Sequence, residues 1–339
     1  MLIVTIASVL TAVASMRQIR LDRPGSFSVV DAPVPVPAAG EALVRVQRIG
    51  VCGTDLHAFV GRQPFFHYPR VLGHELAVEI MGLPAGETKF NVGQTCAVEP
   101  YLNCKTCPSC RRNKPNCCEN LKVLGVHIDG GMAEYAAIPV EKLFPSATLS
   151  LDQLALVETL GIGQHAVERA ALRPGESVLV VGAGPIGLAV VQFAIAAGGV
   201  VTVLEPNPAR RAFAERFGAT SITDVGSQLF EVVFDATGNN AAMDKSFEFV
   251  AFGGKLVFVG LMQGRVTFDD PLFHRREMTI LASRNSAGAF PAIIAAIEAG
   301  RIDTTPWITH RLNLEEVPTR FADLPKQTDL VKAMIEVQS

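Results

Sequence analysis

The sequence has no excess of basic residues and no apolar run long enough to span a membrane, and its number of cysteines is not even. It contains 30 Lys and Arg against 33 Asp and Glu, which gives a formal net charge of −3. A chain without a basic surplus has little to attract a polyphosphate, so we expect no nucleic-acid partner. The cysteine count of seven is odd, and a chain of this size needs no covalent staple. Both points favour a reducing, cytoplasmic compartment.

The first fifteen residues, MLIVTIASVLTAVAS, are apolar and end in small residues. No Lys or Arg precedes them, and the run is shorter than the roughly 18 residues expected of a membrane-spanning helix. We interpret residues 1–15 as an N-terminal extension before a natural start at Met16, and we expect no membrane association.

The 339 residues, 49% of them hydrophobic and 19% charged, suffice for two domains with separate cores. From Met16 to about Ala147, short β-like runs alternate with Gly and Pro, which predicts an irregular, mostly antiparallel domain. Beyond Leu151, continuous apolar strands alternate with helix-length segments, as in βαβ units on a buried parallel sheet. The pattern leaves open which domain holds the segment after MTILASRN.

A dinucleotide-binding motif follows the predicted strand SVLVV. Its residues are Gly182, Gly184, Pro185, Ile186 and Gly187. The glycines allow a tight turn, and the helix N-terminus offers amides to a pyrophosphate. Glu205 ends the next strand. It lies roughly 20 residues after the glycine motif, where the acidic residue that accepts the ribose hydroxyls is expected. That carboxylate favours NAD over NADP, although nearby Arg210 is able to accommodate a 2′-phosphate. The alternative is a glycine turn that only packs a helix on a sheet.

A first candidate metal site combines Cys52 in CGTDLH with His74 and Glu75 in GHE. This mixture of soft and hard ligands suits zinc, and three protein ligands with an open position are typical of a catalytic site. Glu158 in VETLGIGQH, at the junction with the nucleotide domain, is a plausible further carboxylate. Each residue alone has an ordinary packing role as its alternative.

A second candidate metal site is the run CKTCPSCRRNKPNCC. Such spacing is compatible with a disulfide staple, a redox switch, a nucleic-acid-binding zinc ribbon or a metal-held lobe. Four thiolates with the spacing C-x2-C-x2-C-x7-C would close a tetrahedral zinc site and leave no room for a substrate. These are Cys104, Cys107, Cys110 and Cys118, and Cys117 and Cys96 are then bystander thiols. The alternative is an empty, reduced cluster.

The order of these motifs, CGTDLH, GHE, the four-cysteine run, VETLGIGQH and GAGPIG, resembles the zinc-dependent medium-chain dehydrogenases, the group of alcohol, sorbitol and threonine dehydrogenases. The polyol and sugar-acid branch is most similar, because Glu158 stands where alcohol dehydrogenases proper carry a cysteine. The resemblance implies an α/β fold. A GroES-like, mostly β catalytic domain would span residues 16–153 and contain a structural zinc lobe at about 96–120. A Rossmann NAD-binding domain would span residues 154–287, and residues 288–339 would return to the catalytic domain.

The resemblance also implies roles for single residues. Cys52, His74 and Glu158 would surround the catalytic zinc, with Glu75 a direct ligand or a nearby carboxylate that exchanges with water. Asp55 would orient His74. The sequence departs from the family pattern at two positions. Val78 stands where a glycine is common, and Thr159 replaces a frequent proline, so the shape of the pocket near the metal stays open.

Thr54 would hydrogen-bond the substrate hydroxyl, and His57 would pass its proton through the cofactor ribose to solvent. The nicotinamide ring would lie over the strand ends VFDATG and VFVGL, which places Val259 and Leu261 at the cofactor. We expect a homodimer or homotetramer in which edge strands of the nucleotide domains pair across a two-fold axis.

The predicted function is hydride transfer between a secondary alcohol and NAD. The substrate would be a polyol, sugar acid or amino alcohol. Two alternatives stay open: a zinc-free quinone or enone reductase-like NADP enzyme on the same fold, and a nucleotide-binding regulatory protein with a vestigial zinc site. Arg62 and Arg70 permit an acidic substrate without requiring one. Phe65, Phe66 and Tyr68 either line the pocket or only pack.

Overall fold

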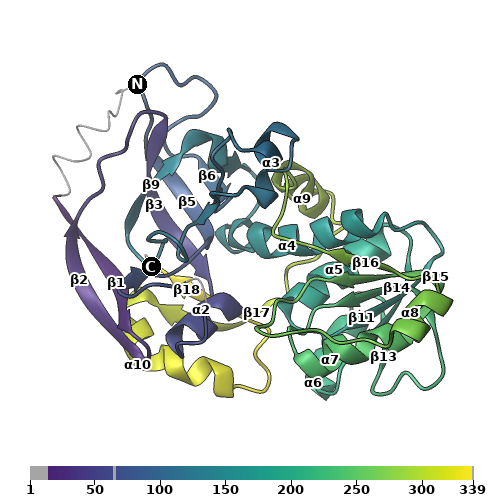
Figure 1. The fold of residues 1–339 in the computed structure, drawn as a ribbon. Coiled ribbons are helices and arrows are strands. Elements are labelled where there is room, and N and C mark those ends of the chain that lie inside the picture. Colours follow the sequence, from purple (N-terminus) through teal and green to yellow (C-terminus); the bar gives the residue numbers. More distant parts are fainter. Residues whose placement is uncertain (1–13, 64–65, 338–339) are drawn as a thin grey trace. The chain divides into compact units, whose positions relative to one another are not determined.

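The computed structural model describes residues 14–63 and 66–337, coloured along the chain in Figure 1. Most of the predicted extension, residues 1–13, and Phe65 lie outside these ranges. The fold divides into two compact units. The first contains the described residues up to Glu158 and those from Thr304 onward, and the second spans Thr159–Asp303. No helix within the described ranges combines the length and apolar character that a bilayer crossing requires.

A seven-stranded sheet forms the centre of the first unit. Its path is β10 (Leu143–Pro145), β6 (Thr95–Val98), β5 (Glu75–Gly82), β3 (Glu41–Gly50), β18 (Lys332–Glu336) and β17 (Ile308–Asn313), and β9 (Tyr135–Pro139) also pairs with β3. All of these pairs are antiparallel except β17 with β18. Because β18 lies beside β3, the C-terminal strands complete a sheet that begins about 290 residues earlier.

Smaller elements surround this sheet. Two further sheets contain β2 (Ser26–Pro33), β1 (Ser15–Arg23) and β4 (Arg70–Val71) in one, and β7 (Tyr101–Leu102) with β8 (Lys122–Val123) in the other. The helices are α2 (Gly53–Phe59), α3 (Pro108–Arg111), α10 (Val317–Arg320) and the start of α4 (Leu151–Ala170). The main core joins β3 and β5 to the C-terminal segment, since Val46, Ile80 and Ile335 are fully buried in one apolar cluster.

The second unit is a parallel six-stranded sheet. Its order is β13 (Thr220–Ile222), β12 (Val200–Leu204), β11 (Ser177–Val181), β14 (Phe230–Asp235), β15 (Val250–Phe258) and β16 (Thr279–Ala282). Counted within the unit this is 3-2-1-4-5-6, the order of the dinucleotide-binding Rossmann fold. Residues Val178–Val181 are all buried, which explains the unbroken apolar run, because helices cover both faces of a parallel sheet. The predicted α/β fold class is confirmed.

Helices connect these strands. They are α5 (Pro185–Ala196), α6 (Pro208–Glu215), α7 (Asn240–Lys245) and α8 (Asp270–Arg275), which Figure 1 shows beside the sheet. The helix α9 (Phe290–Glu298) follows β16, the last strand of the unit. The helix α5 begins directly after β11 at an N-cap glycine, with a proline in its first turn. Proline suits this place because its missing N–H would have no partner there.

Candidate functional site

The structure brings three predicted metal ligands together at the ends of β3 and β5. One ligand atom from each of Cys52, His74 and Glu75 lies within 4.8 Å of the other two. Cys52 follows β3 and stands at the N-cap of α2, whereas Glu75 begins β5. Since Gly50 pairs with Glu75 in the β3–β5 register, the sheet itself places the thiol beside the carboxylate. We call Cys52, His74 and Glu75 the ligand triad.

Glu75 is paired with a lysine that sequence reasoning missed. Lys332 Nζ lies 2.6 and 2.7 Å from the two carboxylate oxygens, and each side chain is only 1% exposed. Burial lowers the pKa of Lys332, but the Glu75 carboxylate, together with Cys52 and Glu158, raises the pKa above its usual value. Gly50 makes room for this pair, because a Cβ there would lie 2.0 Å from Glu75 Oε2.

Asp55 links Cys52 and His74. Its Oδ2 accepts a hydrogen bond of 2.9 Å from the backbone N–H of Cys52. Its Oδ1 lies 3.8 Å from His74 Nδ1, longer than a hydrogen bond but close enough for a strong charge interaction in a buried site. Burial lowers the pKa of His74, yet Asp55, followed by Cys52, raises it well above its usual value. Asp55 itself is fully buried, which raises its pKa.

Glu158 lies near the triad without joining it. Among the described residues, the group with ligand atoms inside 4.8 Å contains only the three members named above. The Tyr101 hydroxyl instead donates a short hydrogen bond to Glu158 Oε1, and both side chains are buried. Burial and then the Glu158 carboxylate raise the pKa of Tyr101 well above its usual value, so the phenol keeps its proton and acts as the donor.

The two predicted proton-relay residues lie on α2. Thr54 is half-buried in its first turn, and His57 is exposed on the following turn. This exposure gives the His57 imidazole direct access to solvent, as a residue that releases protons requires. The structure thus places both residues on the helix that Cys52 caps.

The four predicted lobe cysteines form a second group with ligand atoms within 4.8 Å. Backbone amides donate to their sulfurs: Cys107 N to Cys104 at 3.3 Å, Cys110 N to Cys107 at 3.5 Å and Cys104 N to Cys118 at 3.2 Å. Amides of Thr106 and Cys107 lower the pKa of Cys104 to about 5. Such donors stabilise thiolates, which is the form that binds zinc. Cys117 is exposed and lies outside this group.

The glycine motif forms a tight turn between β11 and α5. Gly182 has φ of +90°, in the region that favours glycine. At Gly187 a Cβ would lie 1.9 Å from the Gly182 carbonyl oxygen, so only glycine allows this approach of helix and strand. Gly184 is the N-cap of α5. Pro185 and Ile186 form its first turn, so the amides at its start are arranged for an anion.

Glu205 supports this turn directly. Its two oxygens accept hydrogen bonds from Ala183 N at 2.8 Å and Asn207 N at 2.9 Å. The neighbouring guanidinium that contacts this segment belongs to Arg211, which donates to the carbonyls of Glu205 and Pro206. Arg210 lies beside it in the first turn of α6.

Val259 and Leu261 follow the carboxyl end of β15, the edge at which such sheets bind nucleotides. The Val259 N–H donates to the Asp235 carbonyl at the end of β14, and Leu261 is 74% exposed. The sheet therefore brings both predicted strand ends together.

Three of the residues considered for substrate contact, Arg70, Tyr68 and Phe66, have partners within the first unit. Arg70 Nη1 lies 3.1 Å from Asp129 Oδ1. The Tyr68 hydroxyl donates to the Ala58 carbonyl, and its ring packs edge-on against Phe66 at 4.9 Å. Phe66 is buried, so it packs in the core.

Comparisons with known proteins decide the family. The GroES-like domain of alcohol dehydrogenases matches residues 38–148, and the zinc-binding dehydrogenase domain matches residues 185–299. L-Galactonate-5-dehydrogenase of Escherichia coli K12 is 41% identical over 317 residues, which cover 89% of this chain and 93% of that protein. The chain belongs to the zinc-binding alcohol dehydrogenases.

Solved structures agree with this family. An alcohol dehydrogenase of E. coli CFT073 complexed with NADH has a TM-score of 0.91 and 28% identity, with 96% of this chain and 100% of that chain covered. A zinc-binding dehydrogenase of Sinorhizobium meliloti bound to NADP has a TM-score of 0.90 and 28% identity at the same coverage. The predictions of a zinc-dependent dehydrogenase, of hydride transfer on alcohols and of zinc with a nicotinamide coenzyme are confirmed.

The side chains fit both cofactors of this zinc-binding family. The lobe supplies four sulfurs with amide donors, and the triad supplies one sulfur, one imidazole and one carboxylate, which are ligand types that zinc prefers.

Two residues near the triad were not predicted from the sequence, namely Lys332 and Tyr101. A lysine within the apolar run DLVKAMIEV is a recognisable signal of a buried ion pair. Nothing in the sequence pairs Tyr101 with a residue 57 positions away.

Proposed function

We propose that this enzyme oxidises a secondary hydroxyl group of a sugar acid or polyol with NAD at the ligand triad, and reduces the matching ketone in reverse. The observation that carries the proposal is the convergence of Cys52, His74 and Glu75 within 4.8 Å beside α2. The relative that is 41% identical is named as a dehydrogenase of L-galactonate, which favours a sugar acid.

The chemistry divides between the cofactors and the side chains. Bound zinc supplies a Lewis acid that lowers the pKa of a hydroxyl group, and NAD supplies the hydride acceptor. Thr54 would hydrogen-bond the substrate hydroxyl and pass its own proton on, by way of the cofactor ribose, as it takes the proton of the substrate. His57 would then release a proton to solvent from its exposed position. Asp55 keeps His74 oriented through the charge contact at 3.8 Å. Lys332 holds the Glu75 carboxylate and would limit its rotation when zinc is bound.

Glu205 is the proposed determinant of NAD preference. Its carboxylate lies at the end of β12, and a 2′-phosphate brought to it would meet a buried negative charge. The hydrogen bonds to Ala183 N and Asn207 N hold the carboxylate at the phosphate-binding turn. Repulsion of the additional phosphate then disfavours NADP.

A substrate and coenzyme panel tests this proposal. Aldonates, polyols and amino alcohols are offered with NAD and NADP to the wild type, to Glu205→Ala and to Glu248→Ala, an exposed glutamate of the same unit. We expect activity with aldonates or polyols, and a preference for NAD that falls roughly tenfold or more only in Glu205→Ala, because an interaction with a charged group contributes about 1.5–3 kcal/mol. An unchanged coenzyme preference contradicts the role of Glu205, and turnover of amino alcohols alone contradicts the substrate class.

Assembly and compartment form part of the same proposal. We propose a homo-oligomer built through β16, an edge strand whose Thr279 and Ile280 are exposed. We also propose a cytoplasmic location. All seven cysteines fall in the described residues and none is in a disulfide, as expected in a reducing compartment.

A further inference from the structure

The pair of Tyr101 and Glu158 is a polar contact with no role in the scheme above. Both side chains are buried, and the Glu158 carboxylate feels the charges of His74, Glu75 and Lys332. It therefore lies close to the ligand triad. Yet no oxygen of Glu158 is within the 4.8 Å group, while Oε1 accepts the phenol hydrogen bond.

The position of Tyr101 is fixed by the strands beside the cysteine lobe. Tyr101 pairs with Val123 in the β7–β8 hairpin. The strand β7 leads into Cys104, and β8 follows Cys118, so the lobe closes this hairpin. The preceding residue is held as well, because the Leu124 N–H donates to the Pro100 carbonyl at 3.1 Å. Metal bound by the four lobe cysteines would therefore stabilise the strand that carries the phenol.

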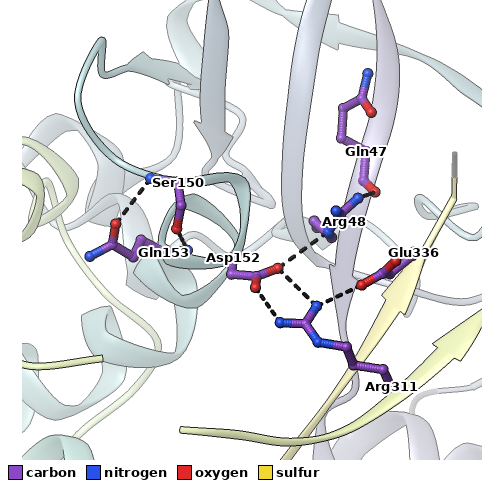
Figure 2. Close-up of polar contacts among 7 residues, drawn as sticks. All are labelled: Gln47, Arg48, Ser150, Asp152, Gln153, Arg311 and Glu336. Atoms are coloured by element: carbon purple, nitrogen blue, oxygen red, sulfur yellow. Dashed lines mark hydrogen bonds and ion pairs between the residues drawn. The ribbon is translucent and has the colours of Figure 1, made fainter. Parts of the chain in front are cut away.

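The position of Glu158 is fixed from the other side by the first turn of α4. Figure 2 shows Asp152 between two arginines: Oδ1 accepts from Arg48 Nε at 3.2 Å, and Oδ2 accepts from Arg311 Nη2 at 2.5 Å. Arg311 also donates to Glu336 at 2.7 Å. The contacts of Asp152 tie the helix to β3 and β17, and Arg311 also links β17 to β18, so all three strands belong to the sheet that carries the triad. Neither partner of the Tyr101–Glu158 bond is on a loose segment.

We propose that Tyr101 is a positioning residue that restrains Glu158 beside the ligand triad, so that the carboxylate does not occupy the position left for the substrate. The proposal rests on the proposed function of the triad. It also gives the cysteine lobe a mechanical connection to the reaction site, since the lobe closes the hairpin that carries Tyr101. Without the phenol hydroxyl, we expect the freed carboxylate to turn toward a metal bound at the triad.

The test is Tyr101→Phe, which keeps the ring and removes only the hydroxyl. Tyr135→Phe, at another buried tyrosine of the same unit, is the control. The zinc of each holoenzyme is replaced with Co²⁺, whose visible absorption reports the number and type of its ligands. The four-thiolate site contributes equally to each protein, so difference spectra isolate the triad. We expect weaker d–d bands from an added ligand in Tyr101→Phe alone, and a loss of about tenfold in kcat/KM, carried mainly by KM.

Three further variants make the result decisive. In Tyr101→Phe/Glu158→Ala the added ligand is gone, so we expect the wild-type spectrum. A wild-type spectrum in Tyr101→Phe itself overturns the proposal, as does loss of the triad metal in Glu158→Ala, which would make Glu158 a ligand. His74→Ala separates this proposal from the one it rests on. If His74→Ala keeps the second metal ion, the triad assignment fails. If it loses that ion while Tyr101→Phe is unchanged, only the role of Tyr101 fails.

Discussion

Lys332 shows how one buried charge shapes the ligand triad. It contacts both oxygens of Glu75, and its distance to the Val51 carbonyl is 3.4 Å. A carboxylate held in this way has less freedom to bind a metal than a free one. The pair is 257 residues apart in the chain, and it forms because β18 lies beside β3.

Lys332→Met removes the cation and leaves the carboxylate buried without its partner. We expect the free energy of unfolding to fall by about 3–5 kcal/mol, the usual effect of breaking one side of a buried pair. Thermal or denaturant unfolding of the zinc-loaded protein measures this.

Lys326→Met is the matched control, because Lys326 forms an exposed pair with Asp323 and exposed pairs contribute little. The account of Lys332 is wrong if both variants unfold within about 1 kcal/mol of the wild type.

The triad was predictable because its residue types and spacing carry the chemistry themselves. Cys52 follows a strand, and His74 and Glu75 are adjacent, so the motif needs no knowledge of distant contacts. Lys332 and Tyr101 have partners that are remote in the sequence. The lysine within DLVKAMIEV signals a buried ion pair without revealing its partner, and nothing local signals the contact of Tyr101. Glu158 was predicted to lie at the site, but its attachment to Tyr101 was not.

At the scale of elements, the β7–β8 hairpin joins the cysteine lobe to the first unit. Its two strands have two residues each, too few to hold a hairpin by backbone pairing alone. The four sulfurs enclose the connection between them. We infer that bound metal holds the lobe together.

Cys107→Ser tests this inference. Loss of one thiolate should remove zinc from the lobe, with up to one ion per chain lost, and lower Tm by about 5 °C or more before it affects the chemical step. Metal analysis and calorimetry measure both effects. Cys117→Ser is the control, because that exposed cysteine lies outside the group. Slow hydride transfer in a Cys107→Ser protein that keeps its zinc and its Tm would reverse the division of roles.

At the scale of the whole molecule, the pattern of apolar runs predicted the fold class well. The unbroken runs beyond Leu151 became the parallel sheet, and the short runs before Ala147 became antiparallel strands. The C-terminal segment was harder, because WITHRLNL and DLVKAMIEV would suit either sheet. Their place beside β3 is decided by tertiary pairing, which periodicity does not contain.

The exposed edge of β16 should mediate self-association. A strand edge with unpaired backbone groups pairs readily with a second edge unless charge blocks it. Ile280→Lys therefore should convert the oligomer to smaller species in sedimentation velocity, with KM for NAD within about twofold of the wild type. Val200→Lys, at an exposed residue of β12, should leave the mass unchanged. An oligomer that persists in Ile280→Lys places the interface elsewhere.

The central claim is that the ligand triad performs the chemistry and that the cysteine lobe does not. The most direct measurement combines zinc content, NADH binding and alcohol oxidation in His74→Ala, with His274→Ala, an exposed histidine of the other unit, as control. We predict loss of one of two zinc ions and a fall in oxidation rate of at least about a thousandfold, with NADH binding kept. Wild-type oxidation rates in His74→Ala would contradict the account.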